Sequence, residues 1–213
     1  RMDRLTSRYF TTDDLRWEQC IYHISLDWWS RLYEYPWAAS FCNSDLTVLD
    51  AGCGVGHHFK FYLAQTCKEV HACDLDSCIL NEKLIIDGIK ESFNYDVTSL
   101  NQKINYQCCD LNQMKYPDNY FDRIFCISVL EHCEPGEVVN ILTGFKRLLK
   151  TDGLIVLTFD VPTNNLLDVI TQNLETLNLT LAGDLLLERP ENAIYNKTWE
   201  LYCFRMVLKI DQL

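Results

Sequence analysis

One short segment constrains the fold more than any other: an apolar run that ends in an acid and is followed by alternating glycines. Leu46–Asp50 predicts a buried strand, and Gly56–Thr66 predicts the helix after it. The glycines are Gly52, Gly54 and Gly56. Glycines at alternate positions let the backbone turn sharply and let a ligand approach closely, because no Cβ intrudes. This turn follows the carboxyl end of its strand, where open α/β sheets bind ligands.

The segment differs from two common phosphate-binding loops. The dinucleotide fingerprint G-x-G-x-x-G needs a third glycine where this chain has His57 or Phe59, which argues against a nicotinamide oxidoreductase. No Gly-Lys-Ser/Thr follows the turn, so it is not a phosphate loop either. Asp50, just before the glycines, would repel a phosphate but suits a cationic ligand.

Short apolar runs and helical patterns alternate along the rest of the chain. Further strands are expected at Glu69–Asp74, Ile104–Cys109, Phe121–Ser128 and Leu154–Phe159. Helices are expected at Ser77–Gly88, Pro135–Lys150 and Asn164–Asn173, with a turn at Asp152–Gly153. Two extended C-terminal segments, Leu177–Leu187 and Trp199–Ile210, fit an antiparallel pair at one sheet edge. The alternation predicts an α/β fold, with a parallel sheet covered by helices on both faces.

The composition shifts near residue 45, which divides the chain into a helical cap segment, 1–44, and a main domain, 45–213. The first segment is rich in aromatic residues, and Trp17, Ile21, Ile24 and Trp28 recur at helical spacing, as in a core stripe. Aromatic rings can also stack on a sugar or ring, or surround an amine. The candidates for such contact with a substrate are Trp28, Trp29, Tyr33 and Trp37.

Charge and cysteine content limit the partners of the chain. The net charge is −11, which disfavours nucleic acid because phosphate backbones are repelled. The 11 cysteines form no paired metal-ligand spacing, so we expect free thiols in a cytoplasmic protein and no metal site. No apolar stretch approaches the length of a membrane span, so no membrane partner is expected. Because Arg1 stands where Met would, we expect residues before it to be missing.

Four features in order carry a resemblance to a known family. After the Asp50-to-Gly56 segment, the second strand ends in Asp74 and the third in Cys109-Asp110-Leu111. The stretches Tyr116–Ile124 and Ser128–His132 then follow as P-D-x-x-F-D and V-L-E-H patterns. Over about residues 46–159 the chain resembles the class I S-adenosylmethionine-dependent methyltransferases, in particular the small-molecule branch called type 11.

The resemblance implies a Rossmann-like, seven-stranded, mostly parallel sheet with an antiparallel C-terminal strand. It implies S-adenosylmethionine as cofactor and S-adenosylhomocysteine as product. Asp74 would accept the ribose hydroxyls, and Asp110 the adenine amino group between Leu75 and Leu111. The glycine turn would receive the amino acid end, with Asp50 orienting its ammonium. The implied cofactor-binding residues are Asp50, Gly52, Gly54, Gly56, Asp74, Leu75, Asp110, Leu111 and Ser128.

Methyl transfer from a sulfonium is an in-line displacement that mainly needs positioning. A general base is needed only if the acceptor must lose a proton, and His132 and Glu131 are the candidates. Both residues can instead simply hold the loop after the fourth strand. The acceptor would be an O or N atom of a small molecule, such as a sugar or secondary metabolite, and the enzyme a monomer or homodimer.

Two other functions stay open at this point. An aminopropyl transferase shares the scaffold, but its acidic loop after the fourth strand is represented here only by Glu131 and Glu134. A non-catalytic cofactor-binding subunit or degenerate homologue would keep the same glycine segment. Product detection against a metabolite panel separates this last alternative from an active methyltransferase.

Overall fold

A computed structural model describes residues 3–213, so the expectation about Arg1 falls outside the described residues. The first strands are β1 (Arg8–Tyr9), β2 (Gln19–Cys20), β3 (Tyr22–His23), β4 (Thr47–Ala51), β5 (Glu69–Asp74) and β6 (Ile104–Cys108). The later strands are β7 (Phe121–Ile127), β8 (Leu149–Val161), β9 (Leu179–Leu181), β10 (Tyr195–Asn196) and β11 (Leu201–Ile210). The α-helices are α1 (Arg31–Ala39), α2 (Phe59–Thr66), α3 (Glu82–Phe93), α4 (Thr98–Asn101), α5 (Pro135–Leu148) and α6 (Leu166–Asn173). Three 3-10 helices are η1 (Ser77–Leu80), η2 (Leu111–Gln113) and η3 (Leu130–His132).

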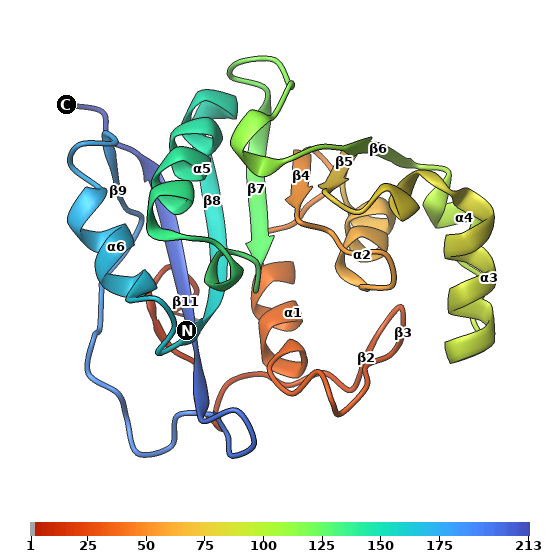
Figure 1. The fold of residues 1–213 in the computed structure, drawn as a ribbon, viewed down its shortest axis with the longest axis horizontal. Coiled ribbons are helices and arrows are strands. Elements are labelled where there is room, and N and C mark those ends of the chain that lie inside the picture. Colours follow the sequence, from red (N-terminus) through yellow and green to blue (C-terminus); the bar gives the residue numbers. More distant parts are fainter. Residues whose placement is uncertain (1–2) are drawn as a thin grey trace.

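The main sheet is nine-stranded and mostly parallel at its centre (Figure 1). Strands β6, β5, β4, β7 and β8 lie side by side in parallel, and β11 pairs antiparallel with β8. This confirms the Rossmann-like fold with its antiparallel C-terminal strand. The count exceeds seven because the short strands β1, β9 and β10 all pair with β11.

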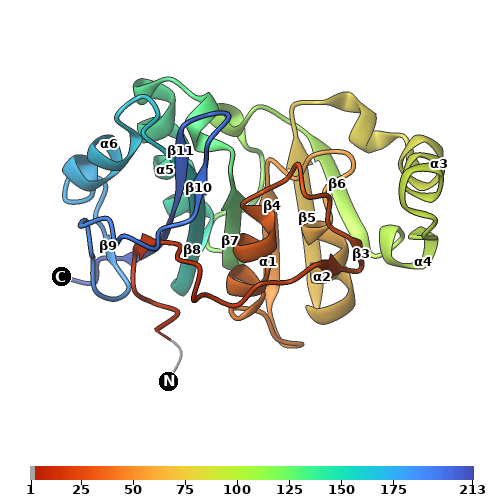
Figure 2. The same cartoon turned by 90° about the horizontal axis from the view of Figure 1, so that it is seen from below.

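The sheet divides the apolar core into two layers because successive side chains of a strand face opposite sides. On β7, Phe125 and Ile127 pack in the cluster with α1, α2 and α3. Ile124 and Cys126 of the same strand pack in the cluster with α5 and α6. Figure 2 shows α1 and α2 on one face of the sheet and α5 and α6 on the other. Helices therefore cover both faces, as expected from the alternation of elements.

The N-terminal segment differs from the expected helical stripe. Residues 17–28 form no helix; β2 and β3 pair there around Ile21, which has a positive φ of 67°. Helix in this segment is α1 alone, and β1 joins the main sheet through β11. The helical spacing was misleading. The side chains of Trp17, Ile21, Ile24 and Trp28 pack on the apolar cluster that contains α2, but from a chain that is not helical.

Several element boundaries also differ from the sequence-based predictions. Helix α2 begins at Phe59 rather than Gly56, and the second predicted helix is split into η1 and α3. The predicted turn at Asp152–Gly153 lies inside β8. The β7–β8 register shifts there, because the pair Phe121–Leu149 is followed by Arg123–Leu154. A bulge thus absorbs the turn residues within one continuous strand.

The described part of the chain contains no helix long and apolar enough to cross a membrane. Its 11 cysteines are free thiols, and five of them are buried in the core. Among residues 3–213 no three or more His, Cys, Asp or Glu side chains gather where they could hold a metal ion.

Candidate active site

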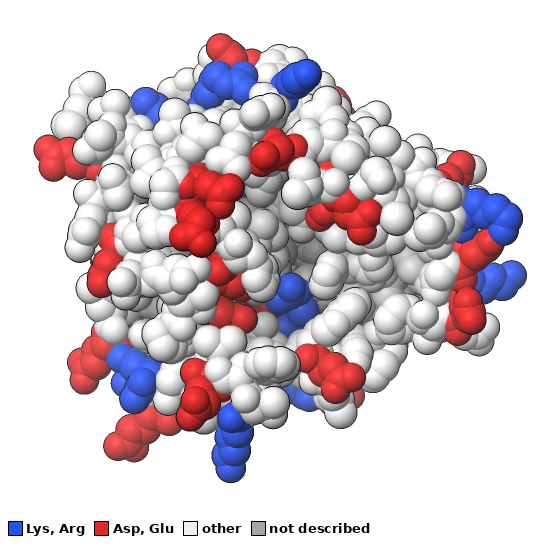
Figure 3. Space-filling view, in the orientation of Figure 1, with Lys and Arg blue, Asp and Glu red and all other residues white. Residues whose placement is uncertain are grey.

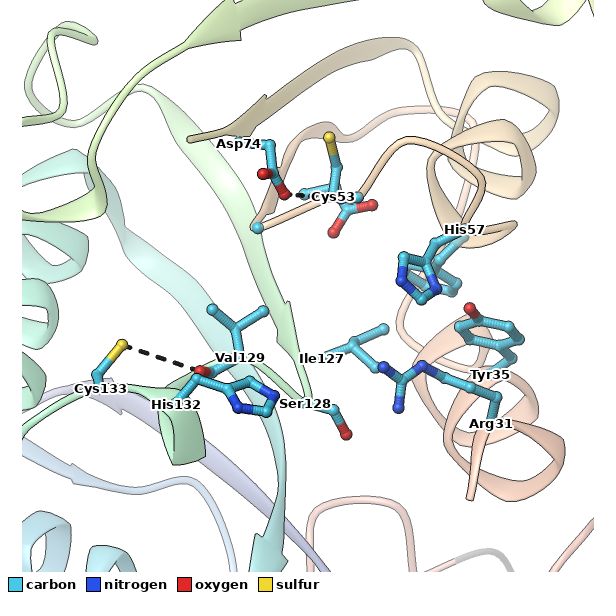
Figure 4. Close-up of a pocket in the computed structure, with 14 residues that line it drawn as sticks. Arg31, Tyr35, Cys53, His57, Asp74, Ile127, Ser128, Val129, His132 and Cys133 are labelled. Atoms are coloured by element: carbon cyan, nitrogen blue, oxygen red, sulfur yellow. Dashed lines mark hydrogen bonds between the residues drawn. The ribbon is translucent and has the colours of Figure 1, made fainter. Parts of the chain in front are cut away.

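A cavity of about 340 Å³ opens at the carboxyl ends of β4, β5 and β7, beside α1 (Figure 4). The order in which strands are added to the sheet reverses beside β4: β5 and β6 extend the sheet on one side of it, and β7 and β8 on the other. Such a reversal leaves a crevice at the carboxyl ends of the strands. Figure 3 shows this face hollowed near its centre, with basic and acidic atoms near one another at the edge of the hollow.

The glycine turn forms one wall of this cavity. Gly52 and Gly54 have positive φ values of 75° and 62°, a region that residues with a side chain rarely adopt. A Cβ on Gly54 would lie 2.0 Å from His57 Cδ2, and one on Gly52 would lie 2.5 Å from Val129 Cγ2. Both positions therefore require glycine, for backbone and for space.

A buried lysine ties the same turn together. The side chain of Lys60 is fully buried, and its Nζ donates to the carbonyls of Gly54 at 2.9 Å and His57 at 2.7 Å. Burial lowers the pKa of this ammonium, although nearby acids oppose the shift. The lysine fixes the carbonyl side of the turn from within the protein.

Two acids lie next to the turn. Asp74 accepts the backbone N–H of Gly54 at 2.8 Å and that of Asp76 at 3.0 Å, so it connects the ends of β4 and β5. Asp50 is 4% exposed, and burial raises the pKa of its carboxyl to about 7, with Lys60 opposing and Asp74 adding to the shift.

A buried polar network joins α1 to the ends of β7 and β8. Glu34 is fully buried and accepts from Ser128 Oγ at 2.6 Å, from Thr158 Oγ1 and from Arg31 at 2.8 Å. Burial opposes ionisation of Glu34, but Arg31 and the two hydroxyls keep its pKa below the ordinary value. Ser128 itself has a φ of 51°, so the network holds a non-glycine residue in the left-handed region at the cavity wall.

A second hollow of about 330 Å³ adjoins the first. The two share Arg31, Ser128 and His132, which line both. The second hollow is otherwise lined by residues of the N-terminal segment, η3, the end of β8 and the start of β11. Those residues are Asp27, Trp28, Trp29, Ser30, Glu131, Asp160, Trp199 and Leu201.

The family follows from a comparison with known proteins. A family model described as a methyltransferase domain matches residues 49–157, just over half of the chain. The chain belongs to this family. The methyltransferase uses S-adenosylmethionine as its cofactor, as the resemblance of the glycine segment implied.

Solved structures share the fold of the methyltransferase at low sequence identity. A protein from Pyrococcus horikoshii OT3 is 20% identical with a TM-score of 0.61, over 87% of this chain and 92% of that one. The [4+2]-cyclase SpnF is 12% identical with a TM-score of 0.63, over 95% of this chain and 87% of that one. A phosphoethanolamine N-methyltransferase from Haemonchus contortus is 23% identical with a TM-score of 0.45; the match covers 55% of this chain but only 23% of that one.

The residues of the first cavity fit the cofactor. S-adenosylmethionine carries a ribose diol, a carboxylate and two cationic groups, so its site needs both acceptors and donors. Asp74 and Asp50 supply acceptors, and Arg31 supplies a donor. Two further buried atoms that line the cavity, Tyr35 Oη and His57 Nδ1, have no hydrogen-bond partner among residues 3–213.

Several residues expected from the sequence lie at these two hollows. Asp50, Gly52, Gly54, Asp74 and Ser128 line the first. The proposed base His132 lines both, whereas Glu131, Trp28 and Trp29 line only the second.

Other expected site residues lie outside both linings. Leu75 is 73% exposed beyond β5, and Asp110 accepts from Asn112 at the start of η2, next to Leu111. Gly56 has no positive φ, and a Cβ there would meet nothing within 4 Å. Tyr33 is half-buried against the core.

The prediction that Trp37 contacts the substrate is wrong, and two histidines that follow the glycine turn are buried or half-buried. Trp37 is 4% exposed and packs edge-on against Phe10 and Phe41, so it belongs to the core rather than to an acceptor pocket. His57 lines the first cavity, and the neighbouring His58 is fully buried and stacks on Tyr22 at 4.0 Å. Burial lowers the pKa of His57 to about 3 and of His58 to about 4.

Sequence reasoning missed several residues of the site, among them Arg31, Lys60, Asp160 and Trp199. Lys60 lies six positions after Gly54, whereas only folding brings Arg31, Asp160 and Trp199 to the two hollows. The sequence held one signal for Lys60. It stands among apolar residues of the predicted helix, and a lysine that is buried there needs polar partners nearby.

Proposed function

We propose that this methyltransferase transfers the methyl group of S-adenosylmethionine to an N or O atom of a small molecule. The observation that carries the proposal is the pair of adjoining hollows that share Arg31, Ser128 and His132. One hollow has the residue types that suit the cofactor, and the other is lined by aromatic and acidic side chains. The methyl group would pass from the cofactor to the acceptor where these three residues separate the two hollows.

In the proposed cofactor site Asp74 accepts the ribose hydroxyls. The N–H groups of Gly52 and Cys53 already donate to Cys73, and that of Gly54 to Asp74. The carbonyls of Gly54 and His57 accept from Lys60, so the ammonium of the amino acid end is proposed to meet the carbonyl of Gly52 and the carboxyl of Asp50. Arg31 suits its carboxylate, because a guanidinium binds carboxylates in a fork.

The remaining cofactor residues are proposed from the family resemblance. Asp110 would accept the adenine amino group, with Leu75 and Leu111 against the ring. In support, the N–H of Cys109 donates to the carbonyl of Asp74 at 3.0 Å, so Leu75 and Asp110 follow the carboxyl ends of the neighbouring strands β5 and β6. The cofactor supplies an activated methyl group, and the chain holds the acceptor in line with it and excludes water.

Glu131 and His132 are the proposed bases for an acceptor that must lose a proton. They sit in consecutive positions of η3, and both line the second hollow. Glu131 is 5% exposed, and burial raises the pKa of its carboxyl to about 8, with Asp160 adding to the shift. A buried carboxylate with a pKa near neutrality suits proton uptake at physiological pH.

The N-terminal segment, residues 1–44, is proposed to cap the acceptor site, because Trp28, Trp29 and Arg31 line the second hollow. The net charge of −11 suits a neutral or cationic small molecule better than nucleic acid. Lys and Arg side chains are scattered rather than gathered on the face seen in Figure 3. We propose a cytoplasmic monomer or homodimer that contacts no membrane.

The test is calorimetric titration of the purified protein with S-adenosylhomocysteine, followed by mass spectrometry with S-adenosylmethionine and a metabolite panel. We expect Asp74→Ala to weaken binding roughly tenfold or more, because it loses a charged acceptor. The exposed Asp45→Ala is the matched control and should bind normally. Absence of binding by the unmutated protein would overturn the proposal, and binding without any methylated product would favour a non-catalytic subunit.

A further inference from the structure

Two acidic residues, Glu131 and Asp160, line the second hollow next to each other. Glu131 comes from η3 after β7, and Asp160 from the end of β8. The backbone N–H of Asp160 donates to Glu131 Oε1 at 3.3 Å. The other oxygen of Glu131 and Asp160 Oδ1 are buried without a hydrogen-bond partner among the described residues. Glu131 is 5% exposed, so this unpartnered oxygen is shielded from bulk solvent.

Among the described residues, no cation forms an ion pair with either acid, although the charge of Arg31 opposes the rise of both pKa values. Arg31 also lines the hollow, but its guanidinium lies 2.8 Å from Glu34 and forms an ion pair there. The other titratable side chains of the lining are a third acid, Asp27, and the imidazole of His132. An unpartnered buried carboxylate is costly unless a donor or cation meets it. The hollow therefore has an excess of acceptors over donors.

Tryptophans supply the rest of the lining. Trp28, Trp29 and Trp199 surround the acid pair, and Trp199 is 70% exposed. Indole rings attract cations through their faces and also cover apolar groups. Acids together with indoles are the chemistry that recognises an alkylammonium, which supplies both hydrogen-bond donors and positive charge. A sugar would supply donors without charge, and a carboxylate would supply neither.

We propose that the methyl acceptor is a primary or secondary amine whose ammonium form is held by Glu131 and Asp160. This inference rests on the proposed function and names its substrate class. One ammonium N–H proton passes to the Glu131 carboxylate, which frees the nitrogen lone pair. The new N–C bond forms as the C–S bond breaks, and the electron pair of that bond stays on sulfur. The product is the methylated ammonium, and Glu131 then releases its proton to water.

The electrostatics of the pair agree with this role. Burial raises the pKa of Glu131 to about 8 and that of Asp160 to about 6, in each case with a nearby acid adding to the shift. A cation beside the two acids would offset the repulsion that Asp160 exerts on Glu131 and that Glu34 exerts on Asp160. A carboxylate with a raised pKa is also a stronger base toward the ammonium than an ordinary one.

The experiment compares benzylamine with benzyl alcohol, which have the same body and differ in the donor group. Each is titrated calorimetrically into the protein saturated with S-adenosylhomocysteine and into the protein without it. We expect benzylamine to bind at least about tenfold more tightly than benzyl alcohol. We also expect mass spectrometry to find N-methylbenzylamine after incubation with S-adenosylmethionine.

Two variants test the acid pair, and one serves as a control. Glu131→Gln and Asp160→Asn should each weaken benzylamine binding roughly tenfold while leaving S-adenosylhomocysteine binding unchanged. Glu91→Gln, an exposed acid on α3, should bind both normally. Thermal unfolding of each variant shows that it is folded.

Three results would overturn the amine proposal: benzyl alcohol that binds as well as benzylamine, no binding of either probe, or benzylamine binding that both variants keep. If the unmutated protein does not bind S-adenosylhomocysteine, the result bears on the proposed function and not on the amine proposal. It would contradict the proposed function, while the titration without S-adenosylhomocysteine still reports on the acid pair.

Discussion

The hydroxyl of Ser128 donates to the carboxylate of Glu34 at 2.6 Å, which joins the end of β7 to α1 across 94 positions of sequence. Ser128 lines both hollows, and Glu34 also holds Arg31, which lines both as well. One buried carboxylate thus positions two of the three residues at the proposed crossing point.

Replacing Glu34 should destabilise the fold strongly. Glu34→Gln leaves the Arg31 guanidinium half-buried without its anionic partner, and removing one member of a buried ion pair costs about 3–5 kcal/mol. Urea unfolding gives the free energy of unfolding for comparison with Glu91→Gln, which should change it by less than about 0.5 kcal/mol. Equal stability of the two variants would show that the network contributes nothing.

The glycine turn offers a matched pair of substitutions. Gly54→Ala adds a Cβ at a φ of 62° and 2.0 Å from His57 Cδ2, so it should cost about 1–3 kcal/mol and weaken S-adenosylhomocysteine binding. Gly56→Ala meets nothing within 4 Å and should be neutral, or stabilising by about 0.4–1 kcal/mol. Calorimetry and urea unfolding measure both quantities. Similar effects of the two substitutions would contradict this account of the turn.

Lys60 should stabilise the turn through hydrogen bonds rather than through charge. Lys60→Met keeps most of the volume but leaves the carbonyls of Gly54 and His57 without their donor, at a cost of about 1–3 kcal/mol. S-adenosylhomocysteine should bind more weakly because the turn loosens. The exposed Lys68→Met is the control. The prediction fails if Lys60→Met binds and unfolds as the unmutated protein does.

The acid pair should make stability depend on pH. Burial and Asp160 raise the pKa of Glu131 from 4.5 to about 8, so folding favours its protonated form. The stability of the protein relative to Glu131→Gln is then greatest near pH 4.5 and falls as the pH rises to about 8. The slope is at most about 1.4 kcal/mol per pH unit for one proton.

Urea unfolding of both proteins at several pH values between these limits measures that difference directly. A difference that stays constant would mean that Glu131 ionises in the folded protein as it does in the unfolded chain. A difference that grows with pH would mean that folding favours its ionised form, and either result would contradict the prediction. The comparison with Glu131→Gln cancels the contributions of other titrating groups, such as Asp50 and His57.

Local sequence alone determined the scaffold of this protein. The strand that ends in Asp50, the glycine turn and the acid at Asp74 were predictable because the backbone geometry of each depends on neighbouring residues. The start of α5 was predictable for the same reason. Pro135 suits a first helical turn, where Glu137 accepts the N–H of Glu134 at 2.9 Å. Family membership followed from these same motifs in their order.

Only the tertiary structure decided which other side chains meet at the site. Glu34 bonds Thr158 across 124 positions, and no periodicity or motif encodes such a contact. The aromatic N-terminal segment was predicted as helix because its spacing is helical, yet it packs as an extended chain, since burial against α2 and the sheet outweighs local preference. Arg31 and Asp160 joined the site in the same way, through packing between distant segments.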